Sequence, residues 1–374
     1  MSRMLSTMSE VNTNASDRPY WVAFRLAEVA SANRMLALLA HFGSLEAAWA
    51  ADETQLRRVL GNRQRMLGNL LRSRRAIDVP SVMEKLERDG VLVVTLADGG
   101  YPRLLREIAA PPPVLFYKGQ FLETDSLAVA IVGTRRATAY GRETATEIAA
   151  GLAMAGVTVV SGMATGIDGF AHRAALEAGG RTIAVLGSGI YDIYPREHLA
   201  LSRRIGEQGA LISDNLPDAK PDRWNFPARN RIISGLSLGV VVVEAPEKSG
   251  ALITVDFAAD QGRDVFAVPG MATAIASEGC NRILRDGARL VRSASDVLED
   301  LRIRSTAEPV EVQQPLLLDE HERRVLNVLT GEPQHIDDIV ESCDMPLPQA
   351  SAILLVLELR RLVRNGGAQY YTRH

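Results

Sequence analysis

Residues 129–136 read Val-Ala-Ile-Val-Gly-Thr-Arg-Arg, an apolar run that ends at a glycine, a hydroxyl and two guanidinium groups. A helix-compatible segment follows at 143–155. A strand, a tight glycine turn and a helix N-terminus together present backbone N–H groups to an anion, and arginines add bidentate phosphate donors. The pattern therefore predicts a phosphorylated ligand, either a small nucleotide or a polymer.

Three more clusters of glycine and small hydroxyl side chains lie where further strands should end, at 161–168, 187–189 and 249–251. Lys248 precedes the last cluster and adds a cation. The carboxyl ends of the strands in an open parallel sheet share one edge, so we expect the four turns to form a continuous rim. One such turn alone is commonly structural, whereas four on one edge favour a ligand surface.

The second strong element is the run Phe-Pro-Ala-Arg-Asn-Arg that begins at Phe226. Arg229 and Arg231 flank Asn230 at the start of a predicted helix, and Trp224 lies just before the run. Guanidinium groups suit phosphates, and aromatic faces suit unpaired bases. The alternative interpretation is that Phe226 fills the core and Arg229 binds an acid.

Signals for catalysis are weak. The first glycine turn fits neither the Gly-x-Gly-x-x-Gly nor the Gly-x-x-x-x-Gly-Lys-Ser/Thr fingerprint. Asp168 and His172 lie four residues apart and resemble an acid/base pair, but such an aspartate more often starts a helix. Cys280 and Cys343 form no metal or redox motif. We therefore predict a protein that is not an enzyme and has no cofactor and no metal.

Charge is unevenly distributed although the chain of 374 residues has a net charge of only −3. Residues 18–88 carry 12 Lys and Arg against 7 Asp and Glu, whereas residues 318–374 carry 6 against 9. The segment 57–75 holds seven arginines and no acid, which suits either a phosphate backbone or a solvated helix face. With no apolar run long enough to span a bilayer, we expect no membrane contact and a cytoplasmic location.

The order of elements predicts an α/β fold with a doubly wound, mostly parallel sheet between two helical pieces. We expect a disordered leader at 1–17, a small helical domain at 18–88, the sheet domain at 89–302, a linker at 303–317 and a winged helix at 318–374. Predicted strands are 128–132, 157–161, 182–186, 210–213, 240–244, 264–268 and 289–291. Predicted helices are 21–30, 34–42, 44–51, 53–60, 63–75, 142–155, 169–178, 198–208, 229–236, 251–261, 279–286 and 349–362.

Together these motifs resemble the bacterial DNA-processing protein A family (DprA/Smf), over residues 100–295. The matching stretches are Pro-Pro-Pro-Val-Leu-Phe-Tyr-Lys-Gly (111–119), Val-Ala-Ile-Val-Gly-Thr-Arg (129–135), Ser-Gly-Met-Ala-Thr-Gly-Ile-Asp (161–168), Ile-Ala-Val-Leu-Gly-Ser-Gly (183–189), Tyr-Pro (194–195), Phe-Pro-Ala-Arg-Asn-Arg-Ile-Ile-Ser-Gly-Leu-Ser (226–237), Lys-Ser-Gly-Ala-Leu-Ile-Thr (248–254) and Gly-Arg-Asp-Val-Phe-Ala-Val-Pro-Gly (262–270).

The resemblance implies an extended Rossmann-like domain that binds single-stranded DNA, a homodimer, and delivery of the strand to the RecA recombinase during natural transformation. It also implies a SAM-like N-terminal module, a C-terminal winged helix, and contact of the Gly133-Thr134-Arg135 loop with the DNA backbone. The residues that we expect to contact DNA are Gly133, Thr134, Arg135, Ser161, Gly162, Gly166, Phe226, Arg229, Asn230, Arg231, Lys248, Ser249, Gly250 and Asn281.

The sequence departs from the family pattern in four places. Thr165 lies where the family often carries arginine or another residue, so that loop contributes less charge. The segment 28–32 lacks the glycines expected in an early helical turn, and 213–215 reads Ser-Asp-Asn in place of a Ser-Glu pair. The negative C-terminal domain argues against strong duplex binding, and we interpret it as a protein contact. Two rival functions stay open. One is a phosphoribohydrolase acting on nucleoside monophosphates, although its Pro-Gly-Gly-x-Gly-Thr loop is absent, and the other is a structural adaptor.

Overall fold

The computed structural model describes residues 17–29, 31–61, 63–303, 319–359, 362–367 and 369–373. The chain divides into two compact units, Met1–Ala307 and Glu308–His374, which are described separately. The predicted leader, except Asp17, and most of the predicted linker lie outside the described residues.

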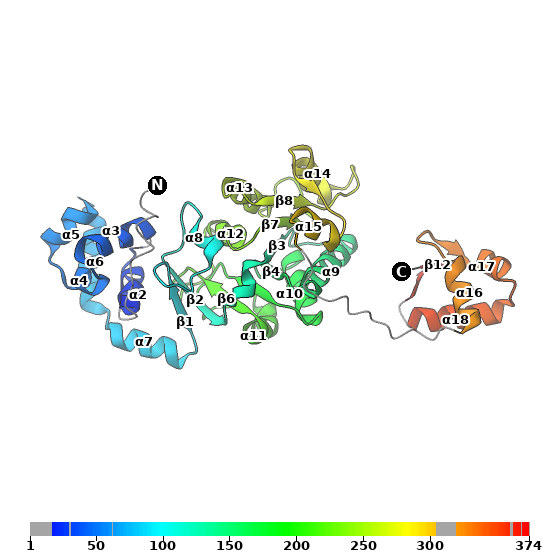
Figure 1. The fold of residues 1–374 in the computed structure, drawn as a ribbon, viewed down its shortest axis with the longest axis horizontal. Coiled ribbons are helices and arrows are strands. Elements are labelled where there is room, and N and C mark those ends of the chain that lie inside the picture. Colours follow the sequence, from blue (N-terminus) through cyan, green and yellow to red (C-terminus); the bar gives the residue numbers. More distant parts are fainter. Residues whose placement is uncertain are drawn as a thin grey trace. The chain divides into compact units, whose positions relative to one another are not determined.

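The first unit begins with a helical module (Figure 1). Its helices are α2 (Arg18–Leu26), α3 (Ala32–Phe42), α4 (Leu45–Ala50), α5 (Glu53–Leu60), α6 (Gln64–Ala76) and α7 (Val79–Arg88). Helix α5 has the predicted bounds because Asp52 and Gln55 cap it reciprocally. The turn after α2, which lacks glycine, is made by Glu28 with φ +63°. Helix α7 was not predicted.

A nine-stranded sheet follows in the order β1-β2-β6-β5-β4-β3-β7-β8-β9. Its strands are β1 (Leu92–Thr95), β2 (Val114–Gly119), β3 (Ala128–Val132), β4 (Thr158–Ser161), β5 (Thr182–Val185), β6 (Ala210–Ser213), β7 (Gly239–Val242), β8 (Asp264–Ala267) and β9 (Arg289–Leu290). The strands from β6 to β9 are parallel, as predicted. The antiparallel pairs β1–β2 and β2–β6 were not predicted.

Helices cover both faces of the sheet, as Figure 1 shows. They are α8 (Arg103–Arg106), α9 (Ala139–Met154), α10 (Ile167–Glu177), α11 (Leu199–Gln208), α12 (Asn225–Gly235), α13 (Leu252–Asp260), α14 (Glu278–Arg285) and α15 (Ala294–Asp300). Strand β3 shows the division, because Val129 and Ile131 pack with α9, α10 and α15 while Ala130 and Val132 face the other core. That second core also contains Trp21, so it continues into the helical module.

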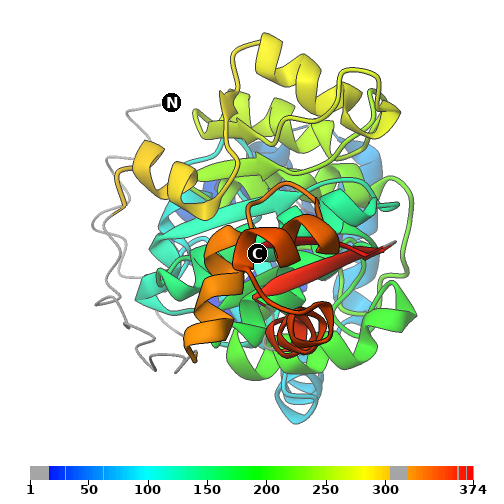
Figure 2. The ribbon, with the colours of Figure 1, turned by 90° about the vertical axis from the view of Figure 1, so that its right-hand side faces the viewer.

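The second unit is a small winged-helix fold, seen in orange and red in Figure 2. Its elements are α16 (Glu320–Val328), β10 (Gln334–His335), α17 (Ile336–Cys343), α18 (Leu347–Leu359), β11 (Val363–Gly367) and β12 (Tyr370–Arg373). The strands form an antiparallel sheet in the order β10-β12-β11. Across the described residues, no helix is long and apolar enough to cross a membrane.

Candidate nucleic-acid interface

The strand order reverses between β3 and β7, and the loops that follow these two strands open there toward one edge of the sheet. A pocket of about 570 Å³ lies at this edge and is called the sheet-edge pocket below. Seven of the residues predicted to contact DNA line it, namely Gly133, Arg135, Phe226, Arg229, Asn230, Ser249 and Gly250. The turns that follow β3, β4 and β7 therefore line one pocket, whereas the predicted cluster at 187–189, after β5, does not line it.

Gly133 holds the first turn tightly against its neighbours. A Cβ at this position would lie 2.5 Å from Cγ1 of Ile167 and 2.8 Å from the carbonyl oxygen of Glu244. The next residue, Thr134, donates its backbone N–H to that same carbonyl at 2.6 Å. Only glycine fits, and the turn brings Arg135 to the mouth of the pocket.

Arg135 is exposed and lies over the ring of Phe226, with its Cζ 5.4 Å from the ring centroid. Tyr194 adds a second ring, whose centroid is 5.6 Å from that of Phe226. Among the described residues, the Arg135 side chain has no hydrogen bond or ion pair. The mouth thus combines an available guanidinium with two aromatic side chains, the combination that suits a phosphate beside an unpaired base.

Arg229 has a different environment although it belongs to the same predicted set. It is 4% exposed and donates to the carbonyl oxygens of Gly162, at 2.7 Å, and of Val185. The buried Asp168 carboxylate accepts from the N–H groups of Gly162 and Ala164, at 3.1 and 3.3 Å. Burial lowers the pKa of Arg229 to about 10 and raises the pKa of Asp168, while each opposes the shift of the other. The two side chains hold the loops together.

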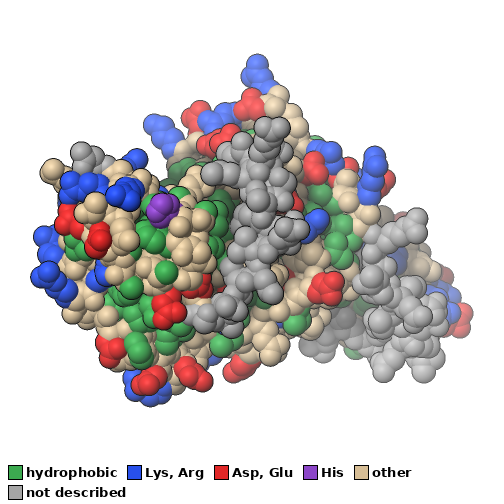
Figure 3. Space-filling model, turned by 60° about the vertical axis from the view of Figure 1, so that its left-hand side comes forward, with side chains coloured by type: hydrophobic (Ala, Val, Ile, Leu, Met, Phe, Trp, Pro, Cys, Tyr) green, Lys and Arg blue, Asp and Glu red, His purple; other side chains and the backbone are tan. Residues whose placement is uncertain are grey.

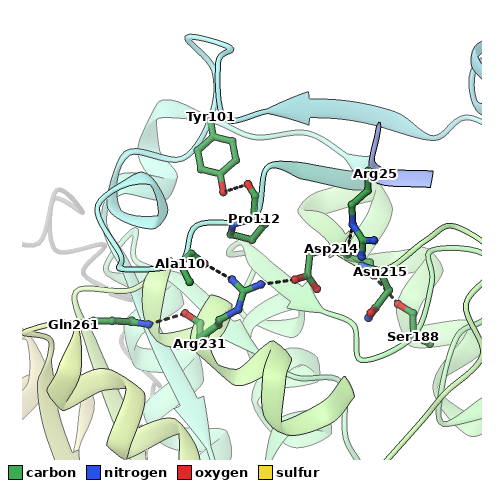
Figure 4. A network of polar contacts seen from close by, with 10 residues as sticks. Arg25, Tyr101, Ala110, Pro112, Ser188, Asp214, Asn215, Arg231 and Gln261 are labelled. Carbon is green, nitrogen blue, oxygen red and sulfur yellow. Dashed lines mark hydrogen bonds and ion pairs between the residues drawn. The ribbon is translucent and has the colours of Figure 1, made fainter. Parts of the chain in front are cut away.

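Arg231 does not line the pocket and belongs instead to a polar network that joins the helical module to the sheet domain (Figure 4). It pairs with Asp214 Oδ2 at 2.5 Å and donates to the Ala110 carbonyl at 2.8 Å. Arg25 of α2 donates to the backbone carbonyl of Asp214 at 2.7 Å. Asp214, which departs from the family pattern, is therefore contacted by one arginine from the helical module and one from the sheet domain.

Some of the other predicted residues make hydrogen bonds within the protein, and others are exposed at the surface. Ser161 donates to the Ile131 carbonyl at 2.6 Å, and the Asn281 amide donates to the Gly270 carbonyl at 3.1 Å. Gly166 has φ +78°, and the N–H of the next residue, Ile167, donates to the Thr134 carbonyl at 3.2 Å. Lys248 is exposed and does not line the sheet-edge pocket.

Asp168 and His172 do not form the acid/base pair that their spacing suggested. Thr182 donates its hydroxyl to the Val159 carbonyl at 2.6 Å, so its oxygen accepts from Nδ1–H of His172 at 2.7 Å. Nε2 of His172 is buried with no partner in the described residues. Burial, aided by nearby cationic groups, lowers the pKa of His172 to about 3. The ring is a neutral core group.

Sequence reasoning missed three features of the site. Tyr194 and Arg223 line the pocket from loops whose position depends on the tertiary fold. The third is Glu244, which is 2% exposed and accepts from the N–H and hydroxyl of Thr138, at 2.8 and 2.6 Å. Thr138 caps α9, so an internal carboxylate occupies the helix N-terminus that was predicted to bind phosphate.

Comparisons with known proteins agree with this architecture. The family model described as DNA recombination-mediator protein A matches residues 92–302, and the DprA winged helix domain matches 308–368. Protein Smf of Synechocystis is 34% identical over 96% of this chain and 99% of its own length. DNA processing protein DprA of Bacillus subtilis is 42% identical over 60% of this chain and 75% of its own length.

Two solved structures share the fold. DNA processing protein A from Streptococcus pneumoniae is 34% identical, with a TM-score of 0.66 over 74% of this chain and 95% of that one. The Helicobacter pylori protein, described for its unique single-stranded DNA binding mode, is 28% identical, with a TM-score of 0.52 over 57% of this chain and 95% of that one. The family description is that of a mediator, which agrees with the prediction that the chain is not an enzyme. The chain belongs to the DprA/Smf family of DNA-processing proteins.

Proposed function

We propose that this protein binds single-stranded DNA without sequence specificity at the sheet-edge pocket and hands the strand to the RecA recombinase during natural transformation. The observation that carries the proposal is the mouth of the pocket, where the Arg135 guanidinium meets the rings of Phe226 and Tyr194. The Helicobacter pylori relative, described as a single-stranded DNA binder, supports the same ligand.

The chemistry of the pocket favours a strand read through its backbone. Guanidinium groups address phosphate oxygens, which are the same in every nucleotide. Phe226 and Tyr194 present ring faces, and stacking on a ring tolerates any base. Asn230 lines the pocket, but its amide already donates to the Gly250 carbonyl at 3.3 Å. Contacts that would distinguish bases are therefore few.

Replacing Arg135 by alanine tests this proposal. Fluorescence anisotropy with two unrelated single-stranded oligonucleotides should show a loss of about tenfold on both, because one charge-assisted phosphate contact disappears. The slope of log affinity against log salt should flatten by about 0.7, the value for one contact on a single strand.

Arg136→Ala is the matched control, since Arg136 is exposed, adjacent and outside the pocket lining. It removes the same charge and should leave affinity nearly unchanged. Equal affinities for wild type and Arg135→Ala would remove Arg135 from the site and take away the main support for the proposal.

We also propose that the protein acts as a homodimer, as the family resemblance implies. Met271 and Ile275, between β8 and α14, are 74% and 71% exposed, which is unusual for apolar side chains of this size. They offer a surface for a second copy. Sedimentation velocity of a Met271→Asp/Ile275→Asp variant should show a monomer at concentrations where the wild type is dimeric.

Delivery to RecA needs a separate measurement. The rate at which RecA assembles on an oligonucleotide already bound by this protein should exceed the rate on the same oligonucleotide bound by an unrelated single-strand binder. An equal or lower rate would limit the function to binding alone.

A further inference from the structure

A second hollow lies on the helical module, outside the sheet domain. It measures about 490 Å³ and lies between the end of α2 and the start of α6. Arg34, Arg63 and Arg65 line it, together with Glu28 and Asn69. This set is called the arginine hollow below. Figure 3 shows the helical module on the left, with Lys and Arg side chains along its outer rim.

The three arginines of the hollow are available for a ligand. Within the described part of the chain, none of Arg34, Arg63 and Arg65 has a hydrogen bond or an ion pair from its side chain. The one carboxylate there, Glu28, accepts from the Asn69 amide at 3.1 Å. Three guanidinium groups around one carboxylate leave a positive concavity, which attracts an anion.

Other arginines of the same module have internal partners. Arg57 pairs with Glu53 at 2.5 Å, and Arg74 donates to the Ala51 carbonyl at 2.7 Å. The arginine-rich segment is therefore divided between structural arginines and those that face the hollow. Helix α6 also begins at the hollow, and it has no side-chain cap and no acid in its first turn, so no residue of that turn offsets the positive end of the helix.

A series of polar contacts links the arginine hollow to the helix that carries part of the sheet-edge pocket. Ala27 and Glu28 of the hollow directly follow α2, where Arg25 donates to the Asp214 carbonyl at 2.7 Å. The Asp214 carboxylate in turn holds Arg231 of α12 at 2.5 Å (Figure 4). The same helix carries Phe226 of the sheet-edge pocket. Residues that adjoin the two sites are thus joined through Asp214.

We propose that the arginine hollow is a second phosphate-binding site, which takes backbone phosphates of the same single strand that occupies the sheet-edge pocket. The inference rests on the proposed function. A strand that engages both sites gains affinity because the second contact is intramolecular. Such a gain requires a strand long enough to reach both, so binding through the hollow depends on oligonucleotide length.

The test compares two double variants of the full chain. Arg63→Ala/Arg65→Ala removes two charges from the hollow. Arg58→Ala/Arg75→Ala removes two charges from exposed positions of the same module that do not line the hollow. Anisotropy is measured with single-stranded oligonucleotides of about 6 and about 30 nucleotides, which lie near the lower end of and well above the range of about 4–16 nucleotides for a single binding site.

The hollow variant should lose about tenfold affinity for the long oligonucleotide, with a salt slope flatter by about 1.4 for two phosphate contacts. Its affinity for the short oligonucleotide should equal that of the wild type, and the control variant should bind both normally. Equal losses in the two double variants, or a loss on the short oligonucleotide as well, would overturn the assignment.

Two further arms separate the possible causes of failure. Inorganic phosphate at submillimolar concentration, titrated at constant ionic strength, should not abolish the higher affinity for the long oligonucleotide. If it does, the hollow takes free phosphate and not a strand. Arg135→Ala should weaken binding of both oligonucleotides. If Arg135→Ala bound them as tightly as the wild type while the hollow variant bound the long one more weakly, the result would contradict the proposed pocket and leave the hollow as the binding site.

Discussion

The sheet-edge pocket and the arginine hollow are both lined by arginines, but they are built differently. In the first, Arg229 is buried and bonded to loop carbonyls while Arg135 remains available beside aromatic rings. In the second, all three arginines face solvent or lie half-buried without aromatic partners. We therefore propose that the first takes a phosphate together with a base, and that the second takes phosphate alone. Burial and internal partners, rather than residue type, separate an arginine that stabilises the loops of a site from one whose side chain remains available for a ligand.

The largest effect expected from this comparison concerns the buried arginine. Arg229→Met leaves the Asp168 carboxylate buried without its counter-charge, so the free energy of unfolding should fall by about 3–5 kcal/mol. Urea denaturation measures the loss. Arg135→Ala should change stability by less than about 0.5 kcal/mol.

The double variant Arg229→Met/Asp168→Asn provides the control, because the amide oxygen still accepts from Gly162 and Ala164 without a buried charge. It should recover much of the lost stability. Suppose instead that Arg229→Met is as stable as the wild type but unable to bind DNA. Arg229 would then contact DNA directly, and burial would not separate structural arginines from binding ones.

Next in size is the aromatic contribution, which only the sheet-edge pocket has. Phe226→Ala should weaken binding of oligonucleotides of any sequence by about 1–3 kcal/mol, the value of one stacked base. Phe226→Trp keeps a ring and should retain most of the affinity. If Phe226→Ala bound normally while Arg135→Ala did not, the pocket would recognise phosphate alone and the two sites would be chemically alike.

A smaller effect is expected from pH through His172. The pKa is about 3 in the folded chain and about 6.5 when unfolded, so below pH 6.5 the unfolded state binds the proton and stability falls as pH decreases toward 3. At pH 5.5 the cost relative to pH 7 is on the order of 1 kcal/mol. The difference between wild type and His172→Asn in urea melts at both pH values isolates this group. Identical pH dependences would mean that His172 titrates normally.

The smallest effect concerns a cation outside both hollows. Lys248→Ala should reduce affinity for single-stranded DNA by less than about twofold, because an exposed, mobile ammonium adds little. The anisotropy assay used for Arg135→Ala applies. A loss as large as that of Arg135→Ala would show that Lys248 closes over the bound strand.

Much of the sheet domain could be predicted because local pattern and tertiary environment agree there. Strands β3 and β6 have the predicted bounds, since each is a short apolar run buried on both faces. Helix α12 begins at Asn225, four residues before the predicted start, because Pro227 is tolerated in the first helical turn. Strands β1 and β2 were missed because they pair antiparallel across a long connection.

The site was predicted less completely than the fold, for a physical reason. Glycine and arginine patterns mark where a chain turns and where charge is placed, and these located Gly133 and Arg135 at the pocket. They do not show which arginine has an internal partner, as Arg231 has in Asp214. That depends on which groups the completed fold brings within reach. The same limit applies to Tyr194, which reaches the pocket from a loop after a different strand.

Glu244 gives the crevice between β3 and β7 a resident negative charge. In nucleotide-binding proteins of similar topology, a pyrophosphate sits in this crevice against the helix N-terminus. Here the Glu244 carboxylate, hydrogen-bonded to Thr138, occupies that position at the helix N-terminus. An arriving dinucleotide would meet repulsion where it needs attraction, while a chain of phosphates passing along the outer loops avoids that point. A single internal carboxylate at this helix N-terminus thus disfavours a dinucleotide in the crevice.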